Sequence, residues 1–303
     1  MTERDDTINN ARILVTGASG LMGGGLASSL ATHNEVIAAA RWGNEEARER
    51  IAATGATPVV FDLAEPSLVA LPDSVDYVFH CGAGLPGTMT QAELFEVNVQ
   101  ATGRLMSRFR TARSFVHCSS AGVYAHQSDH PYVETDRLGV DRHPILDYPL
   151  SKIAGEQLVQ FLSSEFGLPT VILRIFALYG TRGGFPTMLI EKVAKGEPVP
   201  LPPERPVIQN PIFERDFVAK AITAALIADV PPVVINFAGS EPTSVEDYTA
   251  LAGEMVGARV DYVDIPAGFA PSPADLTAME AAVGATSTSV RDGVAEVLRS
   301  LQT

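Results

Sequence analysis

The sequence predicts an α/β protein built on a doubly wound parallel sheet, and three observations lead to this prediction. Short apolar, β-branched segments alternate with segments of helical spacing through residues 11–175. A glycine-rich turn follows the first apolar segment directly. After residue 176 the alternation ends in a proline-rich run, which further helices follow. We therefore expect one domain over residues 1–175 and a smaller mixed α/β region over residues 176–303 that partly returns to the main sheet.

The turn after the first strand gives the clearest indication of a ligand. Residues 11–16 form an apolar strand, and three glycines follow at the spacing of a strand-turn-helix junction. A glycine triplet alone also fits a purely structural turn. Here the glycines would let the backbone approach a ligand, and the N–H groups and dipole of the next helix would favour an anion. The junction predicts a turn for the pyrophosphate of a dinucleotide, formed by Gly17, Ser19, Gly20, Leu21, Met22 and Gly23.

The composition excludes several classes of function. With 46% apolar residues, the chain of 303 residues can bury a large core. Its formal net charge of −14 opposes binding to the phosphate backbone of nucleic acid, which needs clustered Lys and Arg. Residues 1–10 are polar, and no uninterrupted run of apolar residues is long enough to span a membrane. We therefore expect a soluble, cytoplasmic protein with neither a nucleic-acid nor a membrane partner.

The two cysteines, Cys81 and Cys118, each stand near the end of a predicted strand. Their spacing matches neither a Cys-x-x-Cys motif nor a set of metal ligands, so we expect no bound metal. Buried free thiols in a reducing compartment are the expected state.

The end of the second strand, residues 35–40, is expected to contact the adenosine ribose. An acidic side chain there would accept hydrogen bonds from the ribose hydroxyls, but the strand ends in Ala40. The next residue, Arg41, could pair with a 2′-phosphate instead, which favours NADP over NAD. A merely solvated Arg41 is the alternative.

The third and fourth strands, residues 57–61 and 75–80, are predicted to end at the same edge of the sheet. A side chain after the third strand could reach the adenine edge, and small residues after the fourth would let the backbone pass under a sugar of the cofactor. His80 is expected to be a packed strand-end residue, because no relay partner stands near it in the sequence. The residues expected to contact the cofactor here are Asp62, Leu63, Gly82 and Ala83.

The fifth strand, residues 114–118, leads into Ser119 and Ser120, at the edge where ligands of open α/β sheets bind. Farther on, Tyr148 and Lys152 begin a predicted helix, and their spacing of four places them on one helical face. An adjacent ammonium stabilises a phenolate, so Tyr148 could exchange a proton near neutral pH although the ordinary pKa of tyrosine is about 10. A surface pair without a chemical role is the alternative.

The remaining segments complete the predicted architecture. Residues 169–175 form the sixth strand, and the proline-rich run over residues 197–211 is interpreted as an extended loop on the substrate side and not as a polyproline ligand. Thr243 and Ser287 are expected N-caps. The other expected elements are a strand over residues 233–237 and helices over residues 91–110, 148–166, 216–228, 243–256, 273–283 and 287–301.

The glycine turn, the serines after the fifth strand and the pair of Tyr148 and Lys152 resemble, in this order, the extended short-chain dehydrogenase/reductase family of the NAD(P)-dependent epimerase/dehydratase type. The resemblance covers essentially the whole chain and implies a Rossmann-like dinucleotide-binding domain with a smaller C-terminal substrate-binding region. It implies that Ser120 hydrogen-bonds the substrate oxygen and that Tyr148 transfers its proton. It also implies that Lys152 holds the nicotinamide ribose and lowers the pKa of the tyrosine, with Asn98 supporting that lysine.

Departures from the family pattern concern the substrate. Sugar-nucleotide dehydratases of the family have an Asp-Glu pair where this chain has Ala121 and Gly122, so dehydration is disfavoured. Nucleotide-sugar enzymes tend to have an Asn at the position of Ala177 and an Arg on the diphosphate near Gln209, and neither is expected here. The residues expected to contact the substrate are Ser119, Ser120, Tyr148 and Ala177.

These observations predict an NAD(P)-dependent oxidoreductase that transfers hydride at a secondary alcohol or ketone carbon of a polar or sugar-like small molecule, with Tyr148 as acid/base. The first alternative is a redox-neutral nucleotide-sugar epimerase that holds NAD tightly. A non-catalytic dinucleotide-sensing protein is a minor alternative, because a sensor has no chemical need for Ser120, Tyr148 and Lys152. By family analogy we expect a homodimer, formed through the helices over residues 91–110 and 148–166.

Overall fold

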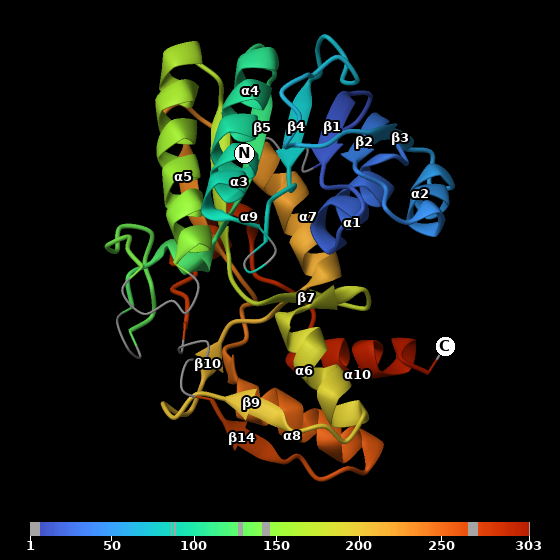
Figure 1. Cartoon of the computed structure of the whole chain (residues 1–303), viewed down its shortest axis with the longest axis vertical. Coiled ribbons are helices and arrows are strands. Elements are labelled where there is room, and N and C mark those ends of the chain that lie inside the picture. Colours follow the sequence, from blue (N-terminus) through green and yellow to red (C-terminus); the bar gives the residue numbers. More distant parts are fainter. Residues whose placement is uncertain are drawn as a thin grey trace. The chain divides into compact units, whose positions relative to one another are not determined.

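The computed structural model describes residues 7–85, 87, 89–126, 130–140, 146–265 and 272–302 (Figure 1). Residues 1–6 of the polar N-terminal segment lie outside this description, as do parts of the polar loop expected before Tyr148. Contacts divide the chain into two compact units of three segments each. Unit 1 comprises Met1–Val123, Ile145–Arg174 and Val218–Ile235, and unit 2 comprises Tyr124–Pro144, Ile175–Phe217 and Asn236–Thr303. The two units are thus interleaved along the chain.

The described residues form a seven-stranded sheet with the order β12-β6-β5-β4-β1-β2-β3. The pairs β1 with β2, β1 with β4, β2 with β3, and β4 with β5 are all parallel. The strand order reverses at β1, which is the position where ligands bind in such sheets. The predicted doubly wound parallel sheet is confirmed. Its strands are β1 (Arg12–Thr16), β2 (Glu35–Ala40), β3 (Thr57–Val60), β4 (Tyr77–His80), β5 (Ser114–Ser120), β6 (Thr170–Ile175) and β12 (Val233–Phe237).

The strands form where the sequence has short apolar runs. Leu14 on β1 is fully buried, and it shares one core cluster with Phe115 on β5 and Ile172 on β6. Burial on both faces is typical of parallel strands that helices cover on each side. The strand boundaries agree with the prediction to within two residues, and β5 includes Ser119 and Ser120, which were expected just beyond it.

The helix predicted over residues 91–110 is interrupted. It consists of α3 (Gln91–Phe95), the π-helical turn η1 (Glu96–Gln100) and α4 (Ala101–Arg108). A π turn inserts an extra residue into the helix and is frequent at functional sites. In Figure 1, α4 runs beside α5 (Asp147–Phe166), which ends because Gly167 adopts a left-handed φ of 62°.

Two further helices, α1 (Leu21–Leu30) and α2 (Glu45–Ala52), also belong to unit 1. Asn44 caps α2 by accepting hydrogen bonds from the N–H groups of Glu46 and Ala47. None of the helices in the described ranges is both long and apolar enough to cross a membrane.

Unit 2 combines short strands with helices around a core that includes Tyr179, Phe213 and Tyr248. One helix of this unit, α6 (Phe185–Ala194), was not predicted. It contains Pro186, which is tolerated because it lies in the first turn of the helix. The other helices are α8 (Val245–Val256), α9 (Thr277–Val283), α10 (Val290–Ser300) and the first turn of α7 (Glu214–Ala225).

The short strands of unit 2 correct the interpretation of the proline-rich run. Residues 197–211 are not one extended loop, because they contribute two paired strands: β9 pairs with β14, and β10 pairs with β13. The strands of this unit are β7 (Leu178–Gly180), β8 (Gly183–Gly184), β9 (Val199–Leu201), β10 (Ile208–Gln209), β11 (Ile212–Phe213), β13 (Thr243–Ser244) and β14 (Tyr262–Asp264).

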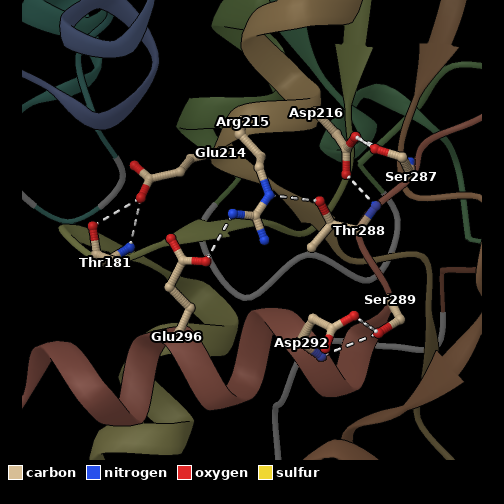
Figure 2. Close-up of polar contacts among 9 residues, drawn as sticks. All are labelled: Thr181, Glu214, Arg215, Asp216, Ser287, Thr288, Ser289, Asp292 and Glu296. Carbon is tan, nitrogen blue, oxygen red and sulfur yellow. Dashed lines mark hydrogen bonds and ion pairs between the residues drawn. The ribbon is translucent and has the colours of Figure 1, made fainter.

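Three helices of unit 2 begin later than predicted, and one of them is α9, which begins at Thr277 and not at residue 273. Ser244, and not Thr243, caps α8. Ser289, and not Ser287, caps α10. Figure 2 shows the reason at α10: the N–H and the hydroxyl of Ser287 both donate to Asp216 at the start of α7. Ser287 is therefore engaged with another helix of its unit and is not free to cap α10.

Candidate active site

The turn between β1 and α1 is closely packed and requires glycine at two positions. Gly17 adopts a φ of +69°, and a Cβ on it would lie 2.7 Å from the Cα of Gly82. A Cβ on Gly23 would lie 2.5 Å from the carbonyl oxygen of Gly17. Both positions therefore exclude a side chain. Gly20 is less constrained, because its Cβ would meet only the Gly17 oxygen, at 3.4 Å, and the residue is exposed.

The start of α1 suits an anionic group. Gly20 occupies the N-cap position, and no side chain within the described residues caps this helix. Its first N–H groups are thus available to phosphate oxygens, and the helix dipole favours negative charge there. Ser19 is exposed at this turn, while Leu21 and Met22 are half-buried. These residues fit the pyrophosphate of a dinucleotide.

The ends of β2 and β3 lie at the same edge of the sheet. Arg41 is exposed directly after β2. The following Trp42 joins the two strands, because its Nε1 donates to the carbonyl oxygen of Val59 at 2.8 Å. After β3, the Oδ1 of Asp62 accepts a hydrogen bond of 3.0 Å from the N–H of Ala64. The contacts of Arg41 and Asp62 with a cofactor stay predictions.

The residues after β4 pack against the glycine turn. The N–H of Gly82 donates to the Oγ1 of Thr16 at 3.2 Å. A Cβ on Gly82 would lie 2.7 Å from the Cδ1 of Leu63 and 3.3 Å from the backbone nitrogen of Gly17, so Gly82 packs closely between these two residues. Ala83 follows and is half-buried. The structure thus brings together residues from the ends of three strands that the sequence analysis assigned to the cofactor.

Ser120 and Tyr148 meet at the carboxyl end of β5. Tyr148 lies in the first turn of α5, and its side chain is hydrogen-bonded with that of Ser120. The Oγ of Ser120 also accepts a hydrogen bond of 3.1 Å from the N–H of Gly122. Because Ser120 is the acceptor in that bond, its own hydroxyl can donate a hydrogen bond to Tyr148 or to a ligand oxygen. Burial raises the pKa of Tyr148 above its ordinary value, and the hydrogen bond with Ser120 opposes this rise.

Lys152 lies one turn farther along α5 and is buried. Its Nζ donates to the carbonyl oxygen of Cys118 at 2.7 Å. Burial lowers the pKa of Lys152, although the nearby Cys118 and Glu156 act in the opposite direction. The expected lowering of the pKa of Tyr148 by this ammonium is not found here. The physical reason is that burial of the phenol dominates and that Lys152 donates to a backbone carbonyl.

Ser119 is engaged with a buried ion pair. Its hydroxyl donates to the Oε1 of Glu156 at 2.5 Å. Glu156 is fully buried on α5, and the Nη2 of Arg174 lies 2.8 Å from its other carboxylate oxygen. The hydroxyl of Ser119 has one proton, which is hydrogen-bonded to Glu156. Of the two serines, only Ser120 can therefore donate a hydrogen bond to a substrate.

Asn98 lies in η1 and is buried. Its Oδ1 accepts a hydrogen bond of 2.7 Å from the N–H of Gly84, and its Nδ2 donates to the Oγ of Ser151 at 2.9 Å. The amide therefore contacts the chain neighbour of Lys152 and not the ammonium itself. The support of Lys152 by Asn98 stays a prediction.

Ala177 belongs to unit 2, whereas Ser120, Tyr148 and Lys152 belong to unit 1. Its carbonyl oxygen accepts a hydrogen bond of 3.0 Å from the N–H of Ile212, and the residue is half-buried. The contact of Ala177 with a substrate stays a prediction.

An arginine does follow Gln209 in unit 2, six positions later. The guanidinium of Arg215 lies over the ring of Phe213, 4.9 Å from its centroid. Figure 2 shows its other partners: Thr288 accepts from the Nε at 3.0 Å, and Glu296 pairs with the Nη1 at 2.8 Å. These contacts give Arg215 a structural role between α7 and α10.

His80 has partners that the sequence analysis missed. It is a buried strand-end residue, as expected, with Nδ1 lying 2.7 Å from the Oγ1 of Thr16 and Nε2 lying 2.9 Å from the Oγ1 of Thr102. These residues are 64 and 22 positions away along the chain, so no local spacing could indicate them. The pairing of β1 with β4 places Thr16 beside His80.

The cysteines are buried and free, and the Sγ of Cys118 lies 3.6 Å from that of Cys81. Over the ranges that the structure describes, no group of three or more His, Cys, Asp or Glu side chains is arranged to hold a metal ion.

Comparison with known proteins relates this arrangement to a family. Residues 13–238 match the family described as "NAD dependent epimerase/dehydratase family". A Bacillus subtilis (strain 168) protein described as "Uncharacterized UDP-glucose epimerase YtcB" is 28% identical over 213 residues. This match covers 65% of this chain and 64% of that relative, so the chain matches less than two thirds of the relative's length.

Solved structures are similar over nearly the whole chain. UDP-glucuronic acid 4-epimerase from Bacillus cereus, in complex with UDP-glucuronic acid and NAD, is 21% identical, has a TM-score of 0.82, and is matched over 96% of this chain and 99% of that chain. MoeE5 in complex with UDP-glucose and NAD is 26% identical, with a TM-score of 0.80 over 96% of this chain and 98% of that chain. The chain belongs to the NAD-dependent epimerase/dehydratase family and is an enzyme of the extended short-chain dehydrogenase/reductase type.

Proposed function

We propose that the protein is a redox-neutral epimerase of a nucleotide sugar, with Ser120, Tyr148 and Lys152 as catalytic residues. The main support is that Ser120 meets Tyr148 at the carboxyl end of β5, at the same sheet edge as the glycine turn. YtcB is described as an uncharacterized UDP-glucose epimerase, and the B. cereus neighbour is a UDP-glucuronic acid 4-epimerase with bound NAD. These relatives favour epimerisation over the net oxidation or reduction that the sequence alone favours.

In this proposal Tyr148 moves the proton. Burial keeps its side chain a phenol at rest, and in the phenolate form it accepts the proton of a sugar hydroxyl. The hydrogen bond with Ser120 favours that phenolate, and Lys152 lies one turn farther along α5. Ser120 donates a hydrogen bond to the same sugar oxygen, keeps its own proton and so orients the hydroxyl. When the carbon is reduced again, Tyr148 returns the proton, so the reaction is balanced without net redox change.

A nicotinamide dinucleotide, when bound, supplies the acceptor and then the donor of the hydride. The chain's own part is to hold it by the turn after β1, by the residues after β3 and β4, and by Lys152 at the nicotinamide ribose. The residues assigned to this role are Gly17, Ser19, Gly20, Leu21, Met22, Gly23, Asp62, Leu63, Gly82, Ala83, Tyr148 and Lys152.

A second candidate, a net oxidoreductase that exchanges NADP, is supported by one observation. Arg41 is exposed directly after β2, and Ala40 before it offers no carboxylate to a ribose. The 2′-phosphate of NADP would therefore lie near a cation and would not be repelled by a carboxylate. We therefore propose NADP as the dinucleotide of this second candidate.

We further propose a homodimer formed through α4 and α5. Leu150 and Phe161 both lie on α5, with exposed fractions of 36% and 62%. Their spacing of eleven residues places them on one face of the helix, close to three turns apart. An apolar face of this kind is typical of a protein contact. A cytoplasmic location is proposed from the composition alone.

The decisive experiment begins with denaturing the freshly purified chain and identifying any released dinucleotide by mass spectrometry. The native protein is then incubated separately with UDP-glucose and with UDP-glucuronic acid. The stereochemistry of the sugar is followed by NMR, and reduction of the dinucleotide is followed by absorbance. We expect a retained dinucleotide, inversion at one sugar carbon without accumulation of reduced dinucleotide, and loss of this activity in Tyr148→Phe.

Other outcomes discriminate between the candidates. Reduced dinucleotide that accumulates in proportion to the sugar consumed would favour the net oxidoreductase. If neither nucleotide sugar binds in calorimetry, the proposed substrate class is wrong.

A further inference from the structure

A chain of buried hydrogen bonds in unit 1 joins the glycine turn to the helix of Tyr148. None of its five side chains is more than 2% exposed. At such depth each polar group has to find its partner within the protein. The five come from separate elements: Thr16 ends β1, His80 ends β4, Asn98 lies in η1, Thr102 in α4 and Ser151 in α5.

The hydroxyl of Thr102 determines which nitrogen of His80 holds the proton. It donates to the backbone carbonyl oxygen of Asn98 at 2.9 Å. A hydroxyl has one proton, so this oxygen can only accept from the Nε2 of His80, which lies 2.9 Å away. With Thr102 donating to the Asn98 carbonyl, the tautomer of His80 that satisfies both contacts carries its proton on Nε2.

The other nitrogen of His80 is then an acceptor. Burial, together with the charge of Lys152, lowers the pKa of His80 to about 3, so the ring is neutral and has a single N–H. The Oγ1 of Thr16 lies 2.7 Å from Nδ1 and donates to it. The same oxygen accepts from the N–H of Gly82 at 3.2 Å. All hydrogen bonds between the N–H of Gly82 and the carbonyl oxygen of Asn98 are thus donated in the same direction along the network.

The side chain of Asn98 extends this network to the catalytic helix. Its Nδ2 donates to the Oγ of Ser151 at 2.9 Å, and that hydroxyl donates to the backbone carbonyl oxygen of Tyr148 at 2.8 Å. One end of the network therefore lies on Gly82, against the glycine turn, and the other end lies on Tyr148.

We propose that His80, as the neutral Nε2–H tautomer, is a positioning residue that couples the dinucleotide-binding turn to the helix of Tyr148 and Lys152. Its catalytic consequence rests on the proposed function, but its effect on dinucleotide affinity does not. A merely packed histidine would need only to fill space. His80 instead bonds to two hydroxyls, and the single proton of each is already used in a hydrogen bond. Removing the His80 ring therefore leaves a buried hydroxyl without a partner on each side.

The tautomer is tested first, on the wild-type chain. Isotope-labelled histidine in the full protein distinguishes Nδ1–H from Nε2–H by NMR. The titratable groups that face His80 are His117, whose ring centroid is 5.7 Å away, and Lys152. We expect His80 to stay neutral and protonated on Nε2 at neutral pH, with and without dinucleotide. An Nδ1–H tautomer, or a charged ring, would overturn the proposal.

The coupling is tested with a pair of variants at one position. Thr102→Val keeps the shape of the side chain but removes the hydroxyl, whereas Thr102→Ser keeps the hydroxyl. We expect Thr102→Val to weaken NAD or NADP binding about tenfold, the equivalent of one buried hydrogen bond, and Thr102→Ser to restore most of the affinity. In turnover assays Thr102→Val should also shift the pH profile that reports on Tyr148, and Thr102→Ser should not.

A matched control separates positioning from loss of stability. Thr170 is also fully buried, and its Oγ1 donates to the carbonyl oxygen of Leu168 at 2.9 Å, at the opposite end of a strand from the ligand edge. Thr170→Val should lower the melting temperature as Thr102→Val does, without changing dinucleotide affinity or the pH profile. If the two valine variants behave alike, the role of the network is only structural.

Affinity is measured with NAD and NADP alone, without a sugar substrate. A chain that turns over no nucleotide sugar would therefore refute the proposed function while leaving the coupling testable. If Thr102→Val does not fold, the proposal is tested by the tautomer measurement and by the dinucleotide affinity of His80→Gln. Glutamine is suitable because its amide offers an acceptor oxygen and a donor NH2 group in place of the two ring nitrogens.

Discussion

The Nζ of Lys152 donates a hydrogen bond of 2.7 Å to the carbonyl oxygen of Cys118, two residues before Ser120 on β5. One turn later on the same helix, Glu156 accepts a hydrogen bond from Ser119 at 2.5 Å. Two successive turns of α5 are thus bonded to the end of β5. The position of Ser120 relative to Tyr148 therefore depends on these two buried hydrogen bonds between α5 and β5.

The buried pair of Glu156 and Arg174 should be strongly coupled. Replacing one partner, as in Glu156→Leu or Arg174→Met, leaves an uncompensated buried charge and should lower the free energy of unfolding by about 3–5 kcal/mol. The double variant removes both charges and should cost less than the sum of the single changes. Urea denaturation of the three variants measures this coupling, and strictly additive losses would contradict it.

Gly17 should tolerate no side chain. Gly17→Ala introduces a Cβ 2.7 Å from the backbone of Gly82, so the turn has to open, and we expect both lower stability and loss of dinucleotide binding. Gly167→Ala is the matched control, because Gly167 has a similar φ of +62° but nothing lies within 4 Å of its Cβ position. That change should cost only about 1 kcal/mol, and the dinucleotide should bind as in the wild type. Thermal melts and titrations with NAD and NADP compare the two variants.

Arg41 should determine the choice of dinucleotide. If it pairs with a 2′-phosphate, Arg41→Ala should weaken NADPH binding about tenfold and leave NADH binding unchanged, because a charged hydrogen bond contributes about 1.5–3 kcal/mol and solvent screens part of it. Fluorescence titrations of NADPH and NADH with the wild type and with Arg41→Ala test this prediction. Tighter binding of NADH than of NADPH to the wild type would refute the NADP preference.

Phe161 should contribute to self-association. Phe161→Glu places a charge on the apolar face of α5 and should convert a dimer into a monomer in analytical ultracentrifugation, with its secondary structure intact. Val69→Glu is the control, since Val69 is 88% exposed elsewhere in unit 1. It should leave the oligomeric state unchanged. A wild-type chain that sediments as a monomer at all concentrations would rule out the proposed contact.

Tyr248→Phe should stabilise the protein. The hydroxyl of Tyr248 is buried and has no hydrogen-bond partner among the described residues, so removing it should raise the free energy of unfolding by about 1 kcal/mol at neutral pH. Burial raises the pKa of Tyr248, so the folded state keeps the phenol protonated where the unfolded state ionises. The tyrosine's contribution to stability is therefore lost as the pH rises above about 10, and the advantage of the Phe variant should grow there. Denaturant titrations at neutral and alkaline pH test both parts.

Local features of the sequence were sufficient to predict much of the fold and to propose the residues of the site. Apolar runs that are buried on both faces predict the strands directly, because their periodicity does not depend on distant partners. The glycine spacing after β1 and the spacing of four between Tyr148 and Lys152 likewise reflect local geometry. Helix starts were less accurate: Ser287 has the chemistry of an N-cap but is bonded to Asp216, 71 positions away.

The sequence by itself determined the order of strands and helices, the glycine turn and the residues able to move a proton. Only the tertiary structure decided what those residues contact. It directs Lys152 to the Cys118 carbonyl, commits Ser119 to Glu156, and connects Asn98 to Ser151. The physical reason is that a hydroxyl, an amide or an ammonium has few bonding sites. Which partners occupy those sites depends on strand register and helix packing between segments far apart in the chain.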